Sequence, residues 1–174
     1  MIQIYQVGIK LLHPDAKIPT KANPTDSCYD VIAVEREELV FPIIKENGAY
    51  YGNRIYGYKY HLGFALDLPS NTELQIRSRS SIFKTGLVLS NGIGTGDEGY
   101  TGQYSIAFYH VVPELPPYRV GDRVAQIQVV NRADINFNII EKLPNKDRNE
   151  RGWGSSDLKD MSVAEVSRQL GSWL

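Results

Sequence analysis

The stretch Gly63-Phe-Ala-Leu-Asp-Leu-Pro-Ser-Asn-Thr-Glu-Leu-Gln-Ile76 decides the fold class. It holds two short apolar runs, and Pro, Ser and Asn between them are typical of a turn. Similar runs occur on both sides of it, in residues 2–12, 43–44, 86–89, 103–112 and 123–131. Because neither a long helical pattern nor an alternation of strands with helices interrupts them, the sequence predicts an all-β sandwich, jelly roll or small barrel.

Composition places the chain among ordinary globular proteins. It has 174 residues, of which 42% are hydrophobic and 22% charged, enough for one domain with a real core. Lys and Arg number 19 against 20 Asp and Glu, a formal net charge of -1. Binding to nucleic acid or to an anionic membrane is built on accumulated basic charge, so we expect neither as a partner. Any phosphate binding must therefore be local.

Cysteine use and the N-terminal sequence bear on location. Cys28 is the single cysteine, which excludes an intrachain disulfide and a zinc cluster of cysteines, and we expect it to be a small buried side chain. The N-terminus lacks the pattern of a signal peptide, and no apolar run approaches the roughly 18 residues of a membrane span. The sequence therefore predicts a cytoplasmic protein.

Three regions differ from the rest in composition. Residues 46–60 contain five tyrosines and three glycines and predict an extended hairpin, whose tyrosines either pack on a half-exposed sheet or contact a partner. Residues 144–157 are polar and predict a flexible arm. In residues 160–170, Ser162 and Glu165 have capping-box spacing, which predicts a short helix. We thus expect a β domain over 1–143 and a C-terminal part over 144–174.

Three segments carry residues suited to chemistry. Arg77-Ser-Arg-Ser-Ser-Ile82 interleaves guanidiniums with hydroxyls, which are good donors to phosphate oxygens, although a polar turn would look the same. In residues 90–102, dense glycines let the backbone approach a ligand and present Asp97 and Tyr100, although Asp is also a common turn former. Gly121–Ile127 places Gln126 among apolar neighbours as a turn enters a strand.

Other catalytic schemes find little support. The three histidines have no metal-ligand spacing, and the sequence contains neither a Gly-x-Ser-x-Gly elbow nor a Walker A motif. Gly94, Gly96 and Gly99 fit the dinucleotide-binding spacing, but strand-like sequence follows them where that site needs a helix. In the tail, Arg148 and Arg151 precede Trp153, and these cations and the aromatic ring could close over a planar ligand, or simply belong to a flexible, soluble tail.

Taken together, these segments resemble the five motifs of the trimeric dUTPase family, in the family's order. The matching segments are Leu11–Thr20 with Tyr29–Ala33, then Arg79–Ser81, Asn91–Gly102, Gly121–Gln126 and Arg148–Ser156. Cys28 stands where the first motif usually has Gly. In the fifth motif Trp153 replaces the common Phe, Arg151 replaces one Gly and Asp157 replaces the final Gly, which bears on closure of the arm more than on the reaction.

The resemblance implies a jelly-roll-like β fold, a homotrimer with active sites between subunits, and Mg2+-dependent hydrolysis of dUTP to dUMP and pyrophosphate. It implies that Asp97 is the general base and that Asp30 acts on the water shell of the metal. Binding of substrate falls to a larger set of residues: Arg79, Ser80, Ser81, Gln126 and Arg148 for phosphate, Asn91 and Gly94 with the hairpin backbone for uracil, Tyr100 for deoxyribose, and Trp153, Gly154 and Ser155 in the closing arm.

Three alternatives use the same scaffold. A dCTP deaminase, plain or bifunctional, shares the fold and the Arg-Ser-Ser motif, but it needs a glutamate at the position where this chain has Ala107. A non-catalytic nucleotide sensor or protein-binding module would act through the Tyr-rich segment, and retention of Asp97 and Arg148 argues against it. A purely structural trimer gives no reason for the clustered polar residues.

Overall fold

The structure is a computed structural model, and it describes residues 4–146, 165 and 168. The chain divides into two units, Met1–Asp134 and Ile135–Leu174. The named strands all lie in the first unit. The division expected from the sequence, at residues 143 and 144, stays a prediction.

The first unit consists of strands and one short 3-10 helix. The elements are β1 (Gly8–Leu11), β2 (Tyr29–Ile32), β3 (Glu35–Ile44), β4 (Tyr50–His61), β5 (Phe64–Asp67), β6 (Thr72–Arg77), η1 (Ser80–Lys84), β7 (Leu87–Leu89), β8 (Gly94–Gly96), β9 (Ser105–His110) and β10 (Arg123–Asn131). The all-β prediction is confirmed.

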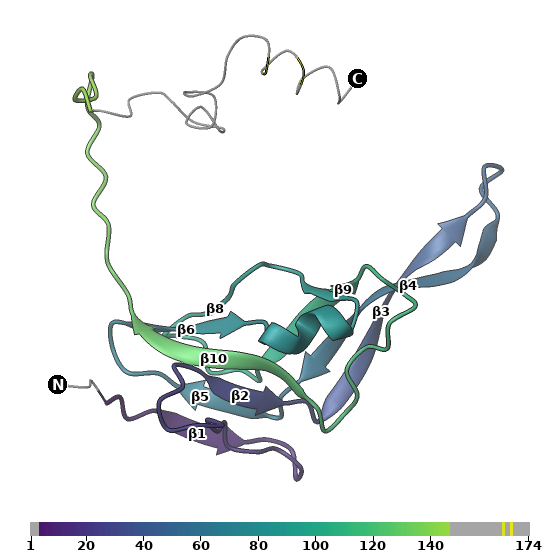
Figure 1. The fold of residues 1–174 in the computed structure, drawn as a ribbon, viewed down its shortest axis with the longest axis horizontal. Helices are drawn as coiled ribbons and strands as arrows, with labels where there is room; N and C mark the ends of the chain where they lie inside the picture. The colour runs from purple at the N-terminus through teal and green to yellow at the C-terminus, as the bar shows by residue number, and fades with distance from the viewer. Residues whose placement is uncertain (1–3, 147–164, 166–167, 169–174) are drawn as a thin grey trace. The chain divides into compact units, whose positions relative to one another are not determined.

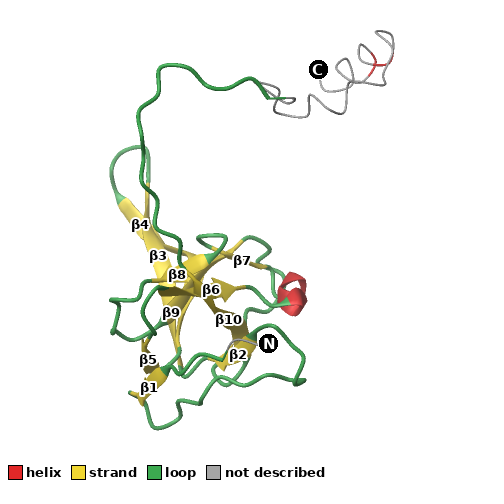
Figure 2. Cartoon of the chain, turned by 90° about the vertical axis from the view of Figure 1, so that its left-hand side faces the viewer, coloured by secondary structure: helices red, strands yellow, loops and turns green. Residues whose placement is uncertain are grey.

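The strands form two four-stranded antiparallel sheets and a two-stranded one. The sheet orders are β2-β10-β6-β8, β3-β4-β9-β7 and β1-β5. Neighbours in a sheet are mostly distant in sequence, as in a jelly roll, and the strands wrap around a shared interior (Figures 1 and 2). This topology brings motifs from opposite ends of the first unit, on β2 and β10, side by side.

The core lies between the sheets and follows from the alternation of side chains along each strand. In β6 the side chains of Thr72, Leu74 and Ile76 are buried and those between them are not. Tyr60 of β4 and Phe108 of β9 are fully buried, with ring centroids 5.7 Å apart at an edge-on angle of 76°. Burying each such side chain contributes about 1.5–3 kcal/mol, so this core fixes the strands that carry the site.

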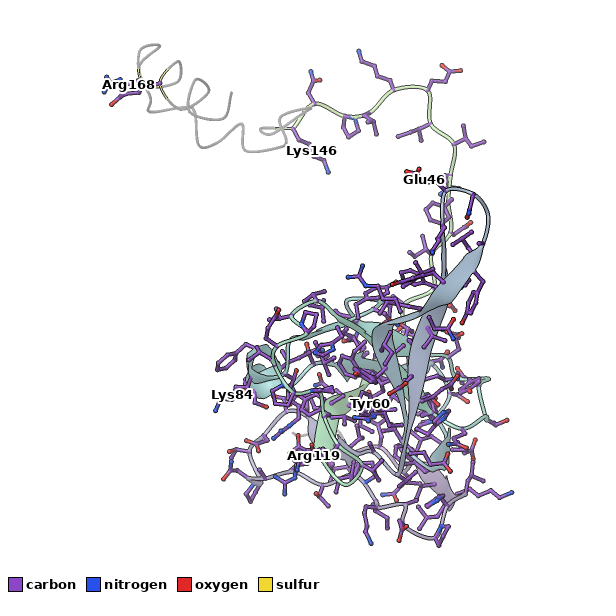
Figure 3. The ribbon with its side chains drawn as sticks, turned by 90° about the vertical axis from the view of Figure 1, so that its right-hand side faces the viewer. Glu46, Tyr60, Lys84, Arg119, Lys146 and Arg168 are labelled. Atoms are coloured by element: carbon purple, nitrogen blue, oxygen red, sulfur yellow. The ribbon has the colours of Figure 1, made fainter. Side chains whose placement is uncertain are left out.

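A long hairpin extends from the body of the first unit (Figure 1). It is formed by β3 and β4, and the turn between them is closed by Lys45 N–H donating to the Ala49 carbonyl at 2.9 Å. Figure 3 shows Glu46 at its tip and Tyr60 in the body. The hairpin expected within residues 46–60 is therefore longer than predicted, because this Tyr-rich segment supplies only the turn and the second strand.

Several other expectations need correction or fall outside the described residues. The first apolar run forms a strand only over Gly8–Leu11, the helix η1 is not predicted by the sequence pattern, and Cys28 is half-buried rather than buried. Of the predicted C-terminal helix only Glu165 and Arg168 are described, and both are helical. No helix among the described residues is long and apolar enough to span a membrane.

Candidate active site

Asp30 is the centre of a charged cluster on the sheet β2-β10-β6-β8. Its carboxylate accepts a hydrogen bond from Arg79 Nε at 3.0 Å, and Arg123 Nη1 lies 3.6 Å from its other oxygen. The Asp30 side chain is only 12% exposed. Two guanidiniums share one carboxylate, so the cluster keeps one positive charge in excess and suits an anion.

The register of the sheet explains why these residues meet. Gln126 on the central strand β10 lies opposite Asp30 of β2 on one side and Arg77 of β6 on the other. Its side-chain amide donates to the Ser78 carbonyl at 3.3 Å, which ties β10 to the loop after β6. Residue alternation thus places Gln126 beside the start of η1, as its predicted role in phosphate binding requires.

The short helix η1 carries the hydroxyls of the cluster. Arg79 is its N-cap residue, and Arg79 Nη1 donates to the Ser81 hydroxyl at 3.3 Å. Ser80 is exposed at the first helical position. The predicted phosphate-binding residues of the described chain therefore lie together.

Arg123 is a functional candidate that the sequence did not single out, although it belongs to the quoted segment Gly121–Gln126. It and Asp30 line a pocket of about 480 Å3, together with Lys17 and Thr20 from the loop before β2. The rest of the lining is apolar, from Leu11, Ala16, Ile18 and Ile32, so the two cations are the groups in this pocket that suit phosphate oxygens.

A second cluster lies on the glycine-rich segment around β8. Asp97 and Tyr100 are both exposed, and the Tyr100 N–H donates to the Asp97 carbonyl at 3.0 Å across a turn. Gly94 faces Ile76 and Asn91, because a Cβ on it would lie 3.1 Å from Ile76 Cβ and 3.4 Å from Asn91 Nδ2. The hairpin predicted for residues 90–102 is wrong, because β8 pairs with β6 and the next strand, β9, lies in the other four-stranded sheet. These residues instead form a strand and the loop that follows it, and Gly94 and Gly96 are buried.

The two clusters lie at opposite ends of β6. Leu74 pairs with Gly96, so Asp97 leaves the sheet beside Glu73, near the beginning of the strand. Arg79 follows the other end, which is Arg77. Glu73 and Arg79 are six residues apart, so at about 3.3 Å per residue roughly 20 Å of chain separates the backbone beside Asp97 from that of Arg79. A single chain therefore does not bring the predicted base to the predicted phosphate site.

The fifth segment cannot be placed in this geometry. Arg148, Trp153, Gly154 and Ser155 lie outside the described residues. Ala107, the position that separates this chain from a deaminase, lies on β9 opposite Lys59 and has no group that transfers a proton.

Comparison with known proteins agrees with this arrangement. The sequence profile of the family described as dUTPase matches residues 14–157. The chain is 30% identical to the deoxyuridine 5'-triphosphate nucleotidohydrolase of Clostridium tetani, over 87% of this chain and 97% of the relative. It is 31% identical to that of Nocardia farcinica, over 90% of this chain and 88% of the relative.

Among solved structures, a variant of the dUTPase of Staphylococcus bacteriophage 80alpha with dUpNHpp has a TM-score of 0.67 and 20% identity. The match covers 87% of this chain and 98% of the phage protein, and at this identity it supports the fold alone. Membership of the family rests instead on the sequence profile and the two relatives, because each of these matches spans most of the chain. The chain belongs to the dUTPase family.

Proposed function

We propose that this protein hydrolyses dUTP to dUMP and pyrophosphate. A water molecule attacks the α-phosphorus, the bond from that phosphorus to the oxygen bridging to the β-phosphorus breaks, and pyrophosphate leaves. Asp97 accepts the proton of the attacking water as general base, a task for an ionised carboxylate within hydrogen-bond reach of that water. Its exposed position at the tip of a turn leaves it accessible to a bound nucleotide.

The separation of the two clusters along β6 is the observation that carries the proposed assembly. Because Asp97 and Arg79 leave opposite ends of the same strand, one chain cannot apply both to one triphosphate. A complete site needs the glycine-rich segment of one copy and the arginine cluster of another. We therefore propose a homotrimer with its active sites between subunits, as the family resemblance implies.

The start of the second unit supports an assembly of this kind. Ile135, Phe137 and Ile139 alternate with polar residues, and their exposed fractions are 72%, 87% and 103%. An alternating apolar segment left in water is unfavourable by about 25 cal/mol per Å2 of apolar surface. Another copy that covers this segment would remove that cost.

Within the phosphate site, the proposed work is positioning and charge stabilisation, the main tools of phosphoryl transfer. Arg79 has guanidinium nitrogens in addition to the Nε that Asp30 holds, and Ser80, Ser81 and Gln126 supply uncharged donors beside it. Arg148 would add a second charge from the arm. The pair with Asp30 holds Arg79 in place before substrate arrives, which lowers the entropy cost of binding.

The residues present fit Mg2+ held mainly by the substrate. Among the described residues no three His, Cys, Asp or Glu side chains come together as a metal site. Mg2+ typically keeps several waters and binds through one or two carboxylates plus phosphate oxygens, and Asp30 supplies one carboxylate at the phosphate site. When bound, the ion would neutralise triphosphate charge. Asp30 would accept hydrogen bonds from the waters of the ion, since a carboxylate has about four acceptor positions and the hydrogen bond from Arg79 occupies one of them.

The glycine-rich segment, residues 90–102, would recognise the nucleoside. Asn91, Gly94 and the backbone of this segment would hold the edge of uracil, and Tyr100 would pack on the deoxyribose and leave no room for a 2′-hydroxyl. Trp153 would stack over the base when the arm closes, with Gly154 and Ser155 beside it. We also propose a cytoplasmic location, which suits a chain with one free cysteine.

One assay tests the activity against its alternatives. The protein is incubated with Mg2+ and either dUTP or dCTP, and release of pyrophosphate and of ammonia is measured. Pyrophosphate from dUTP alone is expected. Ammonia from dCTP would overturn the proposal in favour of a deaminase, and neither product from either nucleotide would favour a sensor.

A further inference from the structure

A buried tyrosine supports the glycine-rich segment that carries Asp97, residues 90–102. Tyr104 is 4% exposed, and its hydroxyl has no hydrogen-bond partner in the described part of the chain. A Cβ built on Gly96 would lie 2.7 Å from this hydroxyl. The Tyr104 side chain therefore fills the space beneath Gly96, one residue before Asp97, and only a glycine fits there without displacing it.

Tyr100 shows the same fit with a second glycine. A Cβ on Gly102 would lie 2.7 Å from the Tyr100 hydroxyl and 2.8 Å from the ring carbon that bears it. The hydroxyl donates to the Gln103 carbonyl at 2.9 Å. The far end of the Tyr100 ring is therefore held against the backbone of residues 102–103, while 46% of the residue is exposed.

The two tyrosines also hold each other. Their ring centroids are 5.2 Å apart with an interplanar angle of 83°, the edge-to-face arrangement that aromatic rings prefer. Tyr104 is fixed from below by the core, through its ring contact with Phe64 at 6.2 Å. The exposed ring of Tyr100 thus rests on a rigid support that reaches into the core.

We propose that Tyr104 and Gly102 are positioning residues that set the discrimination between deoxyribose and ribose. This inference rests on the proposed function, in which Tyr100 packs on the sugar. A ring excludes a 2′-hydroxyl only if it cannot move aside when the larger sugar binds. The Tyr104 ring blocks movement of the Tyr100 ring in one direction. The close fit against Gly102 holds the hydroxyl end of the Tyr100 ring.

Gly102 offers the sharper variant. No positive φ occurs at Gly102, so alanine is compatible with its backbone, and the added methyl group meets only the Tyr100 side chain among the nearest atoms. Gly102→Ala should move the Tyr100 ring and break its hydrogen bond to Gln103 without a change in the core. Gly99→Ala is the matched control on the same segment, because no atom of the described residues lies within 4 Å of a Cβ there.

The experiment measures kcat/KM for dUTP and for UTP in the full-length protein. The ratio of the two should fall about tenfold in Gly102→Ala and in Tyr104→Leu, which keeps an apolar side chain but removes the ring edge. The ratio should stay within about twofold of the native value in Gly99→Ala and in Tyr104→Phe, which keeps the ring. A purely structural role for Tyr104 would lower Tm and slow both substrates alike, and would leave the ratio unchanged.

Tyr100→Ala tests the sugar role of Tyr100 separately from its support by Tyr104 and Gly102. If this variant loses discrimination while Gly102→Ala and Tyr104→Leu keep the native ratio, Tyr100 reads the sugar without this support and the inference is overturned. If Tyr100→Ala itself keeps the native ratio, the sugar role assigned under the proposed function is wrong, and the inference fails with it.

Discussion

Replacing Asp30 by asparagine should strengthen binding of pyrophosphate when no metal is present. The Asp30 carboxylate lies 3.0 Å from Arg79 Nε and 3.6 Å from Arg123 Nη1, so it cancels one of the two charges that attract phosphate. A phosphate held by the outer nitrogens of Arg79 would lie about 6 Å from the carboxylate, where two unit charges repel by about 3 kcal/mol at an effective dielectric constant of about 20. Because Arg123 is half exposed, water reaches the cluster and screens this repulsion. The expected repulsion is therefore about 1.4 kcal/mol, which corresponds to a tenfold change in affinity.

The assay is isothermal titration of pyrophosphate into the native protein and Asp30→Asn in the presence of EDTA. Asp67→Asn is the matched control, since it removes the same charge from an exposed position on β5, outside the cluster. The expected result is about tenfold tighter binding in Asp30→Asn alone, together with slower turnover of dUTP when Mg2+ is supplied. Equal or weaker binding without metal would show that Asp30 does not oppose the phosphate, and the electrostatic argument for the cluster would be wrong.

Three further predictions address the base, the arm and the buried tyrosines. Asp97→Asn should abolish turnover while nucleotide binding persists, as measured by pyrophosphate release and by titration with dUTP, and a normal rate would refute its role as base. Trp153→Ala should weaken binding or slow turnover and leave the oligomer intact in sedimentation, whereas unchanged kinetics would argue against stacking on the base. Burial raises the pKa of Tyr60 and of Tyr104 from 10.0 to about 12, so as the pH rises the unfolded chain loses these protons before the folded chain does. The free energy of unfolding should therefore be highest below pH 10. Between pH 10 and about pH 12 each of these tyrosines should lower it by about 1.4 kcal/mol for every pH unit. Burial also raises the pKa of Tyr118, so Tyr60→Phe should reduce the slope without abolishing it, and urea unfolding of the native protein and the variant across this range checks this.

Two strands of the site, β6 and β10, were predictable because their patterns are local, whereas β2, which carries Asp30, is not among the runs that the sequence predicts. The residue range of β10, Arg123–Asn131, is the one expected from the sequence, and β6 and β9 depart from the expected runs by a few residues at their ends. The turn at Asp97 is likewise predictable, since dense glycines and a turn former lie next to each other in the chain, but the pairing of β8 with β6 is not. Such features need no information about distant segments.

Features that depend on contacts between distant segments were not predictable in the same way. Arg123 is the first residue of β10, directly after a turn, a position where an arginine is ordinarily solvated, and only the pairing of β10 with β2 brings it within 3.6 Å of Asp30. The length of the β3–β4 hairpin was underestimated because residues 35–42 contain four charged side chains, which weaken the alternating apolar pattern of a strand. A strand at the edge of a sheet tolerates such charges, and they discourage pairing with other chains.

Asp30 also links the charge of the whole chain to the chemistry proposed for it. A net charge of -1 excludes a broad basic surface, and the cluster of Arg79 and Arg123 around Asp30 keeps only one positive charge in excess. That excess is small against a triphosphate, so the chain alone neutralises little of the charge on its substrate. With Asp30 in place, metal-free nucleotide meets a carboxylate at the phosphate site, and nucleotide that carries Mg2+ meets an acceptor for the waters of the ion. The carboxylate would therefore favour the metal complex of dUTP over the free nucleotide, a preference that Asp30→Asn should reduce.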